Sequence, residues 1–178
     1  MASRFALSLF LLGAVVTAET AMVQPRYREG NQLIRPEEYR EWVFVGSNLG
    51  MGYSEGQPAR EPTFHNIYMQ PQAYRHYKAT GKFLDKTMLV MEVVSSASQS
   101  SINRRGQFQD KIKGVEVALK DEAKFPEKWA YFNFIGSDGA PLSQAKPFAK
   151  DACWKCHNEH GAVDNVFVQF YPVLRDRM

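Results

Sequence analysis

Cysteine is scarce in this sequence, which has two in 178 residues, both in one short segment as Cys153 and Cys156. Two thiols so close together cannot form the disulfide framework that stabilises many small secreted domains, so we predict a chemical role for them. A strong excess of one charge is also absent, because 22 Lys and Arg stand against 19 Asp and Glu, a formal net charge of +3. This balance excludes a strongly basic nucleic-acid-binding protein.

Long hydrophobic runs are absent too, apart from one apolar stretch near the N-terminus, over about residues 5–16. A membrane anchor needs about 20 apolar residues, whereas this stretch is shorter and is soon followed by Glu19. Residues 16–18 form the small-residue pattern that signal peptidases accept. We therefore predict a signal peptide over residues 1–18, with cleavage as late as Ala21, and an exported, periplasmic chain with no membrane span.

The rest of the chain has the composition of a folded domain, and we predict a single one over residues 19–178. The sequence is 44% hydrophobic and 13% aromatic, which is enough to bury one core. Five segments rich in β-branched and aromatic residues predict strands: 41–45, 64–69, 87–94, 114–119 and 129–135. We expect a mainly β, α+β fold with an antiparallel sheet of about five strands and short helices.

The positions of proline, glycine and serine predict where helices end and where loops lie. A helix is expected over residues 71–80, with Gly81 as its stop signal. Segments 46–62 and 95–101 are typical of exposed loops because they are rich in serine, glycine or proline. The C-terminal part carries no clear strand, and it is expected to form short helices over 152–160 and 164–171.

The segment Cys153-Trp154-Lys155-Cys156-His157 is a C-x-x-C-H motif. In such a motif the two thiols add across the vinyl groups of a haem, and the adjacent imidazole reaches the iron. In an exported chain with no other cysteine, the motif predicts one covalent haem c on a C-terminal helix, with His157 as proximal ligand. A thioredoxin-like pair would lack its usual βαβ context. A zinc site that also used His160 would crowd four ligands into eight residues.

Much of the mature chain resembles the cytochrome P-460 and cytochrome c′-beta family. The segments that carry the resemblance are 39–43, 68–74, 114–121, 128–132, 153–157 and 167–174. The resemblance implies a homodimer of mainly antiparallel β subunits, each with one haem c. Members of the P-460 type oxidise hydroxylamine with a haem that is covalently tied to a lysine. Members of the c′-beta type keep an apolar, Phe-lined pocket that binds nitric oxide.

The resemblance aligns Met91 with the cross-linking lysine of the P-460 proteins. Side chains alternate along a strand, so Leu89, Met91 and Val93 share one face and Lys86 is on the other. Met91 is either a distal ligand, since His/Met ligation is known for haem c, or a residue of the core. The other methionines considered are weaker candidates: Met51, Met69 and Met88.

Two polar residues are also implied to lie on the distal side. His65 aligns with a distal arginine of the P-460 proteins, and Glu116 with a carboxylate thought to move protons. The small residues Gly114 and Ala118 flank Glu116 on its face, which predicts room for a large planar group. A buried carboxylate without a cationic partner holds its proton more tightly, which suits proton transfer or a simple hydrogen bond. His65 could bind the iron, could donate a hydrogen bond to a molecule on the distal side, or could be a polar residue whose hydrogen bonds are made within the protein.

Three functions follow from these candidates. The first is electron transfer with His157 and Met91 as axial ligands and a small redox protein as partner. The second is a five-coordinate protein that binds nitric oxide or another small gas. The third is an enzyme that oxidises hydroxylamine or reduces a nitrogen oxide with Glu116 and His65, although the loss of the lysine counts against it. Three lysines form a loose basic stretch: Lys111, Lys113 and Lys120. We expect a solvated face there, and the alternative is a docking patch for an acidic redox partner.

Overall fold

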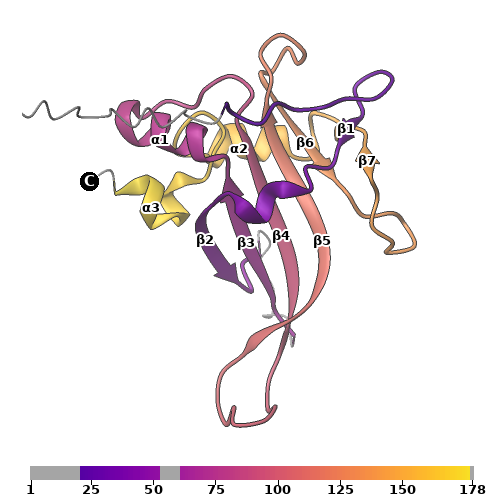
Figure 1. Ribbon diagram of the computed structural model, residues 1–178, viewed down its shortest axis with the longest axis vertical. Helices are drawn as coiled ribbons and strands as arrows, with labels where there is room; N and C mark the ends of the chain where they lie inside the picture. Colours follow the sequence, from indigo (N-terminus) through magenta and orange to yellow (C-terminus); the bar gives the residue numbers. More distant parts are fainter. Residues whose placement is uncertain (1–20, 53–60, 177–178) are drawn as a thin grey trace, which may run out of the picture.

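A five-stranded antiparallel sheet dominates the computed structural model, which describes residues 21–52 and 61–176 (Figure 1). The predicted signal peptide lies outside these residues. No helix within them is long and apolar enough to span a bilayer. The elements are, in chain order, β1 (Leu33–Ile34), η1 (Glu38–Glu41), β2 (Val43–Leu49), β3 (Thr63–Met69), α1 (Pro71–Thr80), β4 (Met88–Ala97), β5 (Phe108–Lys120), β6 (Trp129–Asn133), β7 (Gln144–Ala145), α2 (Trp154–His160), η2 (Val168–Phe170) and α3 (Pro172–Arg175).

The strands of the large sheet follow one another in the order β2-β3-β4-β5-β6, so each pairs with its neighbours in sequence. Neighbours in sequence are the usual partners in antiparallel sheets, because short connections suffice to join them. The predicted α+β fold with about five antiparallel strands and short helices is confirmed. The register pairs Met91 of β4 with Ile67 of β3 on one side and Glu116 of β5 on the other.

Each face of the sheet is covered by a different part of the chain, and each carries its own core. Alternation along the strands sends Leu89 and Tyr131 to one face, where they pack with α1 and the C-terminal segment. It sends Val90 and Phe132 to the other face, where they pack with residues of η1 and β1. Figure 1 shows η1 crossing in front of the strands and α2 behind them.

The helix α1 has the predicted bounds and the predicted signals at both ends. Proline occupies its first turn, where the missing N–H costs no hydrogen bond. Gly81 ends it in the left-handed region with φ 72°, and its N–H donates to the carbonyl of Tyr77 over 2.7 Å. Tyr77 and Ala73, one turn apart, are the buried residues of the helix. They join the core that contains Leu89 and Tyr131.

The strands extend into regions predicted to be loops. β2 continues to Leu49, and β4 continues to Ala97 opposite the start of β5 at Phe108. These extensions are polar, and their side chains bond one another across strands. Asn66, for example, accepts a hydrogen bond from Ser47 over 2.9 Å and donates one to Gln109 over 2.8 Å. The short strand β7 also lies where no strand was predicted, and it pairs with β1.

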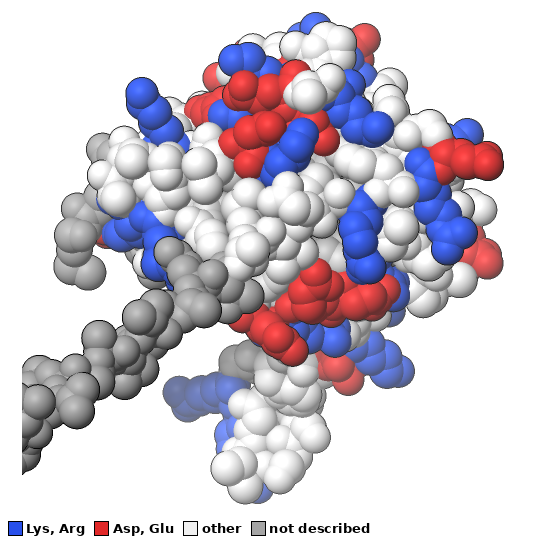
Figure 2. All heavy atoms as spheres, turned by 45° about the horizontal axis from the view of Figure 1, so that its top comes forward, with Lys and Arg blue, Asp and Glu red and all other residues white. Residues whose placement is uncertain are grey.

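Lys120 corrects the prediction that the basic stretch is solvated. Lys111 and Lys113 are exposed, but Lys120 is only 8% exposed, at the end of β5. Its ammonium group donates to the carbonyl of Phe83 over 3.1 Å and to the carboxylate of Asp164 over 2.8 Å. On the face of the molecule drawn in Figure 2, acidic and basic side chains form mixed groups, and uncharged surface separates these groups.

Candidate functional site

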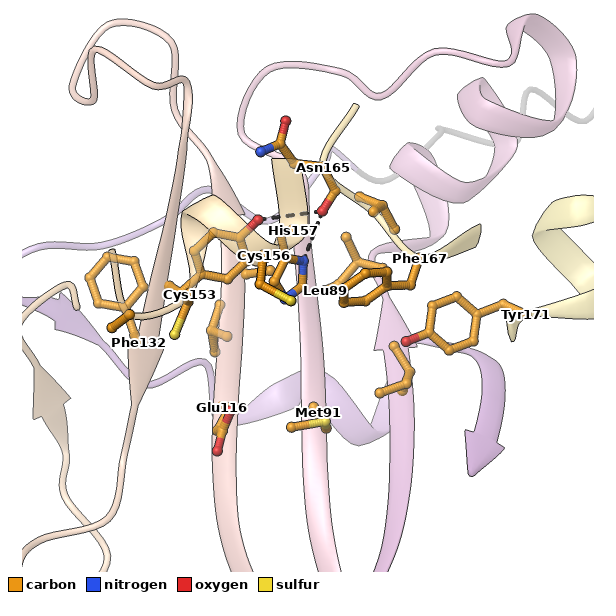
Figure 3. Close-up of a pocket in the computed structure, with 16 residues that line it drawn as sticks. Leu89, Met91, Glu116, Phe132, Cys153, Cys156, His157, Asn165, Phe167 and Tyr171 are labelled. Atoms are coloured by element: carbon orange, nitrogen blue, oxygen red, sulfur yellow. Dashed lines mark hydrogen bonds between the residues drawn. The ribbon is translucent and has the colours of Figure 1, made fainter. Parts of the chain in front are cut away.

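A cavity lies between one face of the sheet and the C-terminal segment (Figure 3). The free space inside it, together with the open solvent at its mouth, is about 940 Å³. The sheet contributes one wall, formed by Ile67, Leu89, Met91, Glu116, Ala118 and Tyr131 among others. The opposite wall comes from the C-terminal segment and includes Cys153, Cys156, His157, Asn165, Phe167 and Tyr171.

The two thiols and the imidazole of the motif reach this cavity from the start of α2. Both cysteines are free and partly buried. Burial raises the pKa of the Cys153 thiol, and the negative charge of Glu116 raises it further. Glu116 lines the same cavity from the sheet wall.

His157 is oriented by contacts on several sides. Its Nδ1 lies 2.9 Å from the carbonyl oxygen of Asn165. A carbonyl can only accept, so Nδ1 carries the proton and Nε2 is left with a free lone pair. The ring packs between Tyr131 and Phe167, with centroid distances of 4.3 and 4.4 Å. Burial lowers the pKa of His157, which favours the neutral imidazole that binds metals.

The carbonyl that orients His157 belongs to a tight turn. Asp164 and Asn165 both have positive φ, 45° and 62°, as in a type I′ turn, and Val163 and Val166 pair across them. The adjacent Asp-Asn pair is a turn signal, since both residues tolerate the left-handed region. This turn interrupts the helix predicted over 164–171, of which only η2 is helical.

Met91 and Glu116 are neighbours on the sheet wall, as their pairing on adjacent strands requires. Figure 3 shows both side chains across the cavity from His157. Burial raises the pKa of Glu116, and no cation in the described part of the chain forms an ion pair with it. In this environment the carboxyl holds its proton more tightly than an exposed one.

His65 lies on the same face of the sheet but is not among the residues that line the cavity. It pairs with Val93, two residues farther along the strands than the pair of Ile67 and Met91. Its Nε2 is 3.2 Å from the hydroxyl of Thr63, and burial lowers its pKa. The structure thus brings Met91 and Glu116 together with the C-x-x-C-H residues but leaves His65 beside the cavity.

The room expected next to Glu116 exists on one side only. Ala118 lines the cavity, as predicted. The space beside Gly114 is filled by the side chain of Ile135, because a Cβ atom on Gly114 would lie only 1.9 Å from the Cδ1 of Ile135. Gly114 therefore makes room for a close packing contact, not for a planar ligand.

The sequence did not identify all of the site. Phe167 packs on the His157 ring, and Tyr171 turns its hydroxyl toward the cavity in Figure 3. Both lie in a segment that resembles the family, but no residue type in it singles them out. The Asn165 carbonyl is a backbone group, so only the turn signal of its neighbourhood pointed to it.

The arrangement favours haem over zinc. Within residues 21–52 and 61–176, no three His, Cys, Asp or Glu side chains are grouped so that they could hold a metal ion. His160 is exposed at the end of α2. A neutral imidazole with Nε2 free, two thiols one helical turn apart and mostly apolar walls fit a haem iron and its macrocycle. His157 would hold the iron, and the two thiols the edge of the ring.

Comparison with known proteins agrees with this fit. No curated protein matches the chain. A family model described as Cytochrome P460 matches residues 36–168 of the 178. The match includes the sheet and the C-x-x-C-H motif, and it extends to the turn that orients His157. The family implies a haem cofactor, and the chain belongs to the cytochrome P460 family.

Proposed function

We propose that the protein is an exported monohaem c-type cytochrome that transfers electrons, with His157 and Met91 as axial ligands. The observation that carries this proposal is that Met91 and His157 line one cavity from opposite walls. A thioether opposite an imidazole stabilises ferrous iron and raises the reduction potential, which suits an electron carrier. The long, flexible Met side chain can adjust to reach an iron atom without moving the strand.

Other residues of the chain would attach the haem and orient its histidine ligand. Cys153 and Cys156 would form thioether bonds to the single haem, whose chemistry is reversible one-electron transfer. Asn165 fixes the tautomer of His157, and the rings of Tyr131 and Phe167 fix its plane. Leu89 and its apolar neighbours give the sheet wall of the cavity its apolar surface.

The visible spectrum of the ferric protein tests the axial ligand. We expect a low-spin, six-coordinate spectrum with a weak sulfur-to-iron band in the far red. Met91→Leu should abolish the band and give a high-spin spectrum. Met88→Leu is the matched control, because Met88 lies on the same strand but belongs to the core of the other face. A high-spin parent protein, or a band that survives in Met91→Leu, would contradict His/Met ligation.

The apolar character of the sheet wall favours a second candidate function. Ile67 and Leu89 adjoin Met91, and this wall suits a neutral diatomic gas if Met91 stays off the iron. The iron of the haem would then be five-coordinate, and the protein would take up nitric oxide readily.

Glu116, which holds its proton tightly, is the group that a hydroxylamine-oxidising or nitrogen-oxide-reducing enzyme would use. Turnover of hydroxylamine that is lost in Glu116→Gln would support that third function.

Export and covalent attachment can be tested together. We propose a periplasmic location, a homodimer and a small redox protein as partner. Protein from the periplasm should begin at residue 19 or 22, with the mass of one haem added. Acidified organic solvent should not extract the haem, because thioether bonds survive it. A full-length chain without added mass would contradict both export and attachment.

A further inference from the structure

The turn that presents the Asn165 carbonyl to His157 is anchored at Asp164 by two buried or partly buried donors. One carboxylate oxygen accepts a hydrogen bond from the ammonium group of Lys120 over 2.8 Å. The other accepts one from the indole N–H of Trp129 over 3.2 Å. Both donors come from the sheet, at the end of β5 and the start of β6. The carboxylate therefore ties the turn to the rigid part of the fold.

A second contact fixes the turn from the side of α2. Gly161 follows the helix, and its N–H donates to the carbonyl of His157 over 2.9 Å. A Cβ atom at this position would lie 2.6 Å from that carbonyl oxygen, 2.8 Å from the carbonyl carbon of Asn165 and 2.9 Å from the nitrogen of Val166. These are backbone atoms, which cannot move aside singly. Only glycine allows the turn to approach the helix this closely.

We propose that Asp164, held by Lys120 and Trp129, and Gly161 are positioning residues that set the strength of the hydrogen bond from His157 to the Asn165 carbonyl. This inference rests on the proposed role of His157 as proximal ligand. A stronger bond at Nδ1 makes the imidazole a more basic ligand, which favours ferric iron and lowers the reduction potential. The end of the sheet thus acts on the iron through the turn, in addition to the packing contact that Tyr131 of β6 makes with the His157 ring.

Two variants with different chemistry weaken this positioning. Asp164→Asn tolerates the positive φ but replaces one accepting oxygen with an NH₂ group that faces a donor. Gly161→Ala keeps every charge and fits the backbone there, φ −69° and ψ 124°, but forces the turn away from the helix. Glu122→Gln is the control, since Glu122 is the other carboxylate that pairs with Lys120, over 3.2 Å, and it does not belong to the turn.

The measurements use haem-loaded protein. The first is the solvent exchange rate of the His157 ring Nδ1–H in the reduced state by NMR, and the second is the reduction potential. We expect exchange to accelerate about tenfold in Asp164→Asn and in Gly161→Ala, as for the loss of one hydrogen bond. The potential should rise in both variants. Glu122→Gln should match the parent protein in both measurements.

The outcomes separate this inference from the proposed function. A parent protein without thioether-bound haem, or without a His157 ring signal, refutes the proposed function itself. If the parent is normal, unchanged exchange in Asp164→Asn and Gly161→Ala overturns the positioning role. A potential that rises in Asp164→Asn alone, with unchanged exchange, overturns it as well, because that result is the effect of a lost charge. Equal acceleration in Glu122→Gln would also overturn it.

Discussion

Glu116 brings an ionisable group into a largely apolar cavity, and the fold bears a cost for this at neutral pH. Burial raises its pKa, so the folded protein holds the proton more tightly than the unfolded chain does. Between the ordinary pKa of a carboxyl and the raised value, the folded state binds more protons. Stability must therefore fall as the pH rises through this window.

Glu116→Gln should remove this pH dependence. The amide cannot ionise, so we expect the variant to be more stable than the parent protein at neutral pH. The difference should disappear at pH values below the ordinary carboxyl range, where Glu116 is protonated in both states. Unfolding midpoints measured across this pH range check the prediction. Glu41→Gln, at an exposed carboxylate, should shift the midpoints little, and a Glu116→Gln advantage that grew as the pH fell would contradict the sign.

At the scale of elements, β5 and the chain directly after β6 are in close packing contact. Gly114 allows Ile135 to pack directly on the strand. Gly114→Ala should cost about 1–3 kcal/mol of unfolding free energy, because the methyl group overpacks this contact. Gly52→Ala is the control, because none of the residues that the structure describes has an atom within 4 Å of the added methyl group. Denaturant titration measures both, and the additional change Ile135→Val should recover part of the loss.

The sequence predicted those strands and helices that are marked by residue types within their own segment. The central strands and α1 were identified because β-branched, aromatic, proline and glycine residues mark them directly. The polar ends of β2, β4 and β5 were not, because their pairing depends on contacts between separate strands, such as the hydrogen bond from the backbone N–H of Lys111 in β5 to the hydroxyl of Ser95 in β4. Lys120 was misjudged for the same reason, since its partner Asp164 follows 44 residues later.

At the scale of the whole molecule, the site lies between two walls that come from separate parts of the chain. The sheet supplies Met91 and Glu116, which the resemblance identified, and the C-terminal segment supplies the thiols and His157, which the motif identified. What neither signal could give is the distance between the walls, because it is set by packing across the core on the cavity side of the sheet. His65 illustrates the limit, since it shares the face of Ile67 yet lies outside the cavity lining.

The same scale governs assembly. The resemblance implies a homodimer, and β2 is the last strand on one side of the sheet. Its residues Phe44 and Leu49 are 50% and 48% exposed, which is high for large apolar side chains. The Phe44 ring packs edge-on against Tyr68, with a centroid distance of 5.6 Å, on the face away from the cavity. A partner subunit that covered this surface would not obstruct the cavity.

We therefore expect Phe44→Asp to convert the proposed dimer into a monomer, because a charge buried in an apolar interface loses its hydration without gaining a partner. Sedimentation velocity measures the change in mass. The haem spectrum should stay as in the parent protein, since Phe44 faces away from the cavity. Leu142→Asp, at another exposed apolar side chain, should leave the dimer intact. A parent protein that sediments as a monomer would contradict the dimer, and a Phe44→Asp dimer would move the interface away from β2.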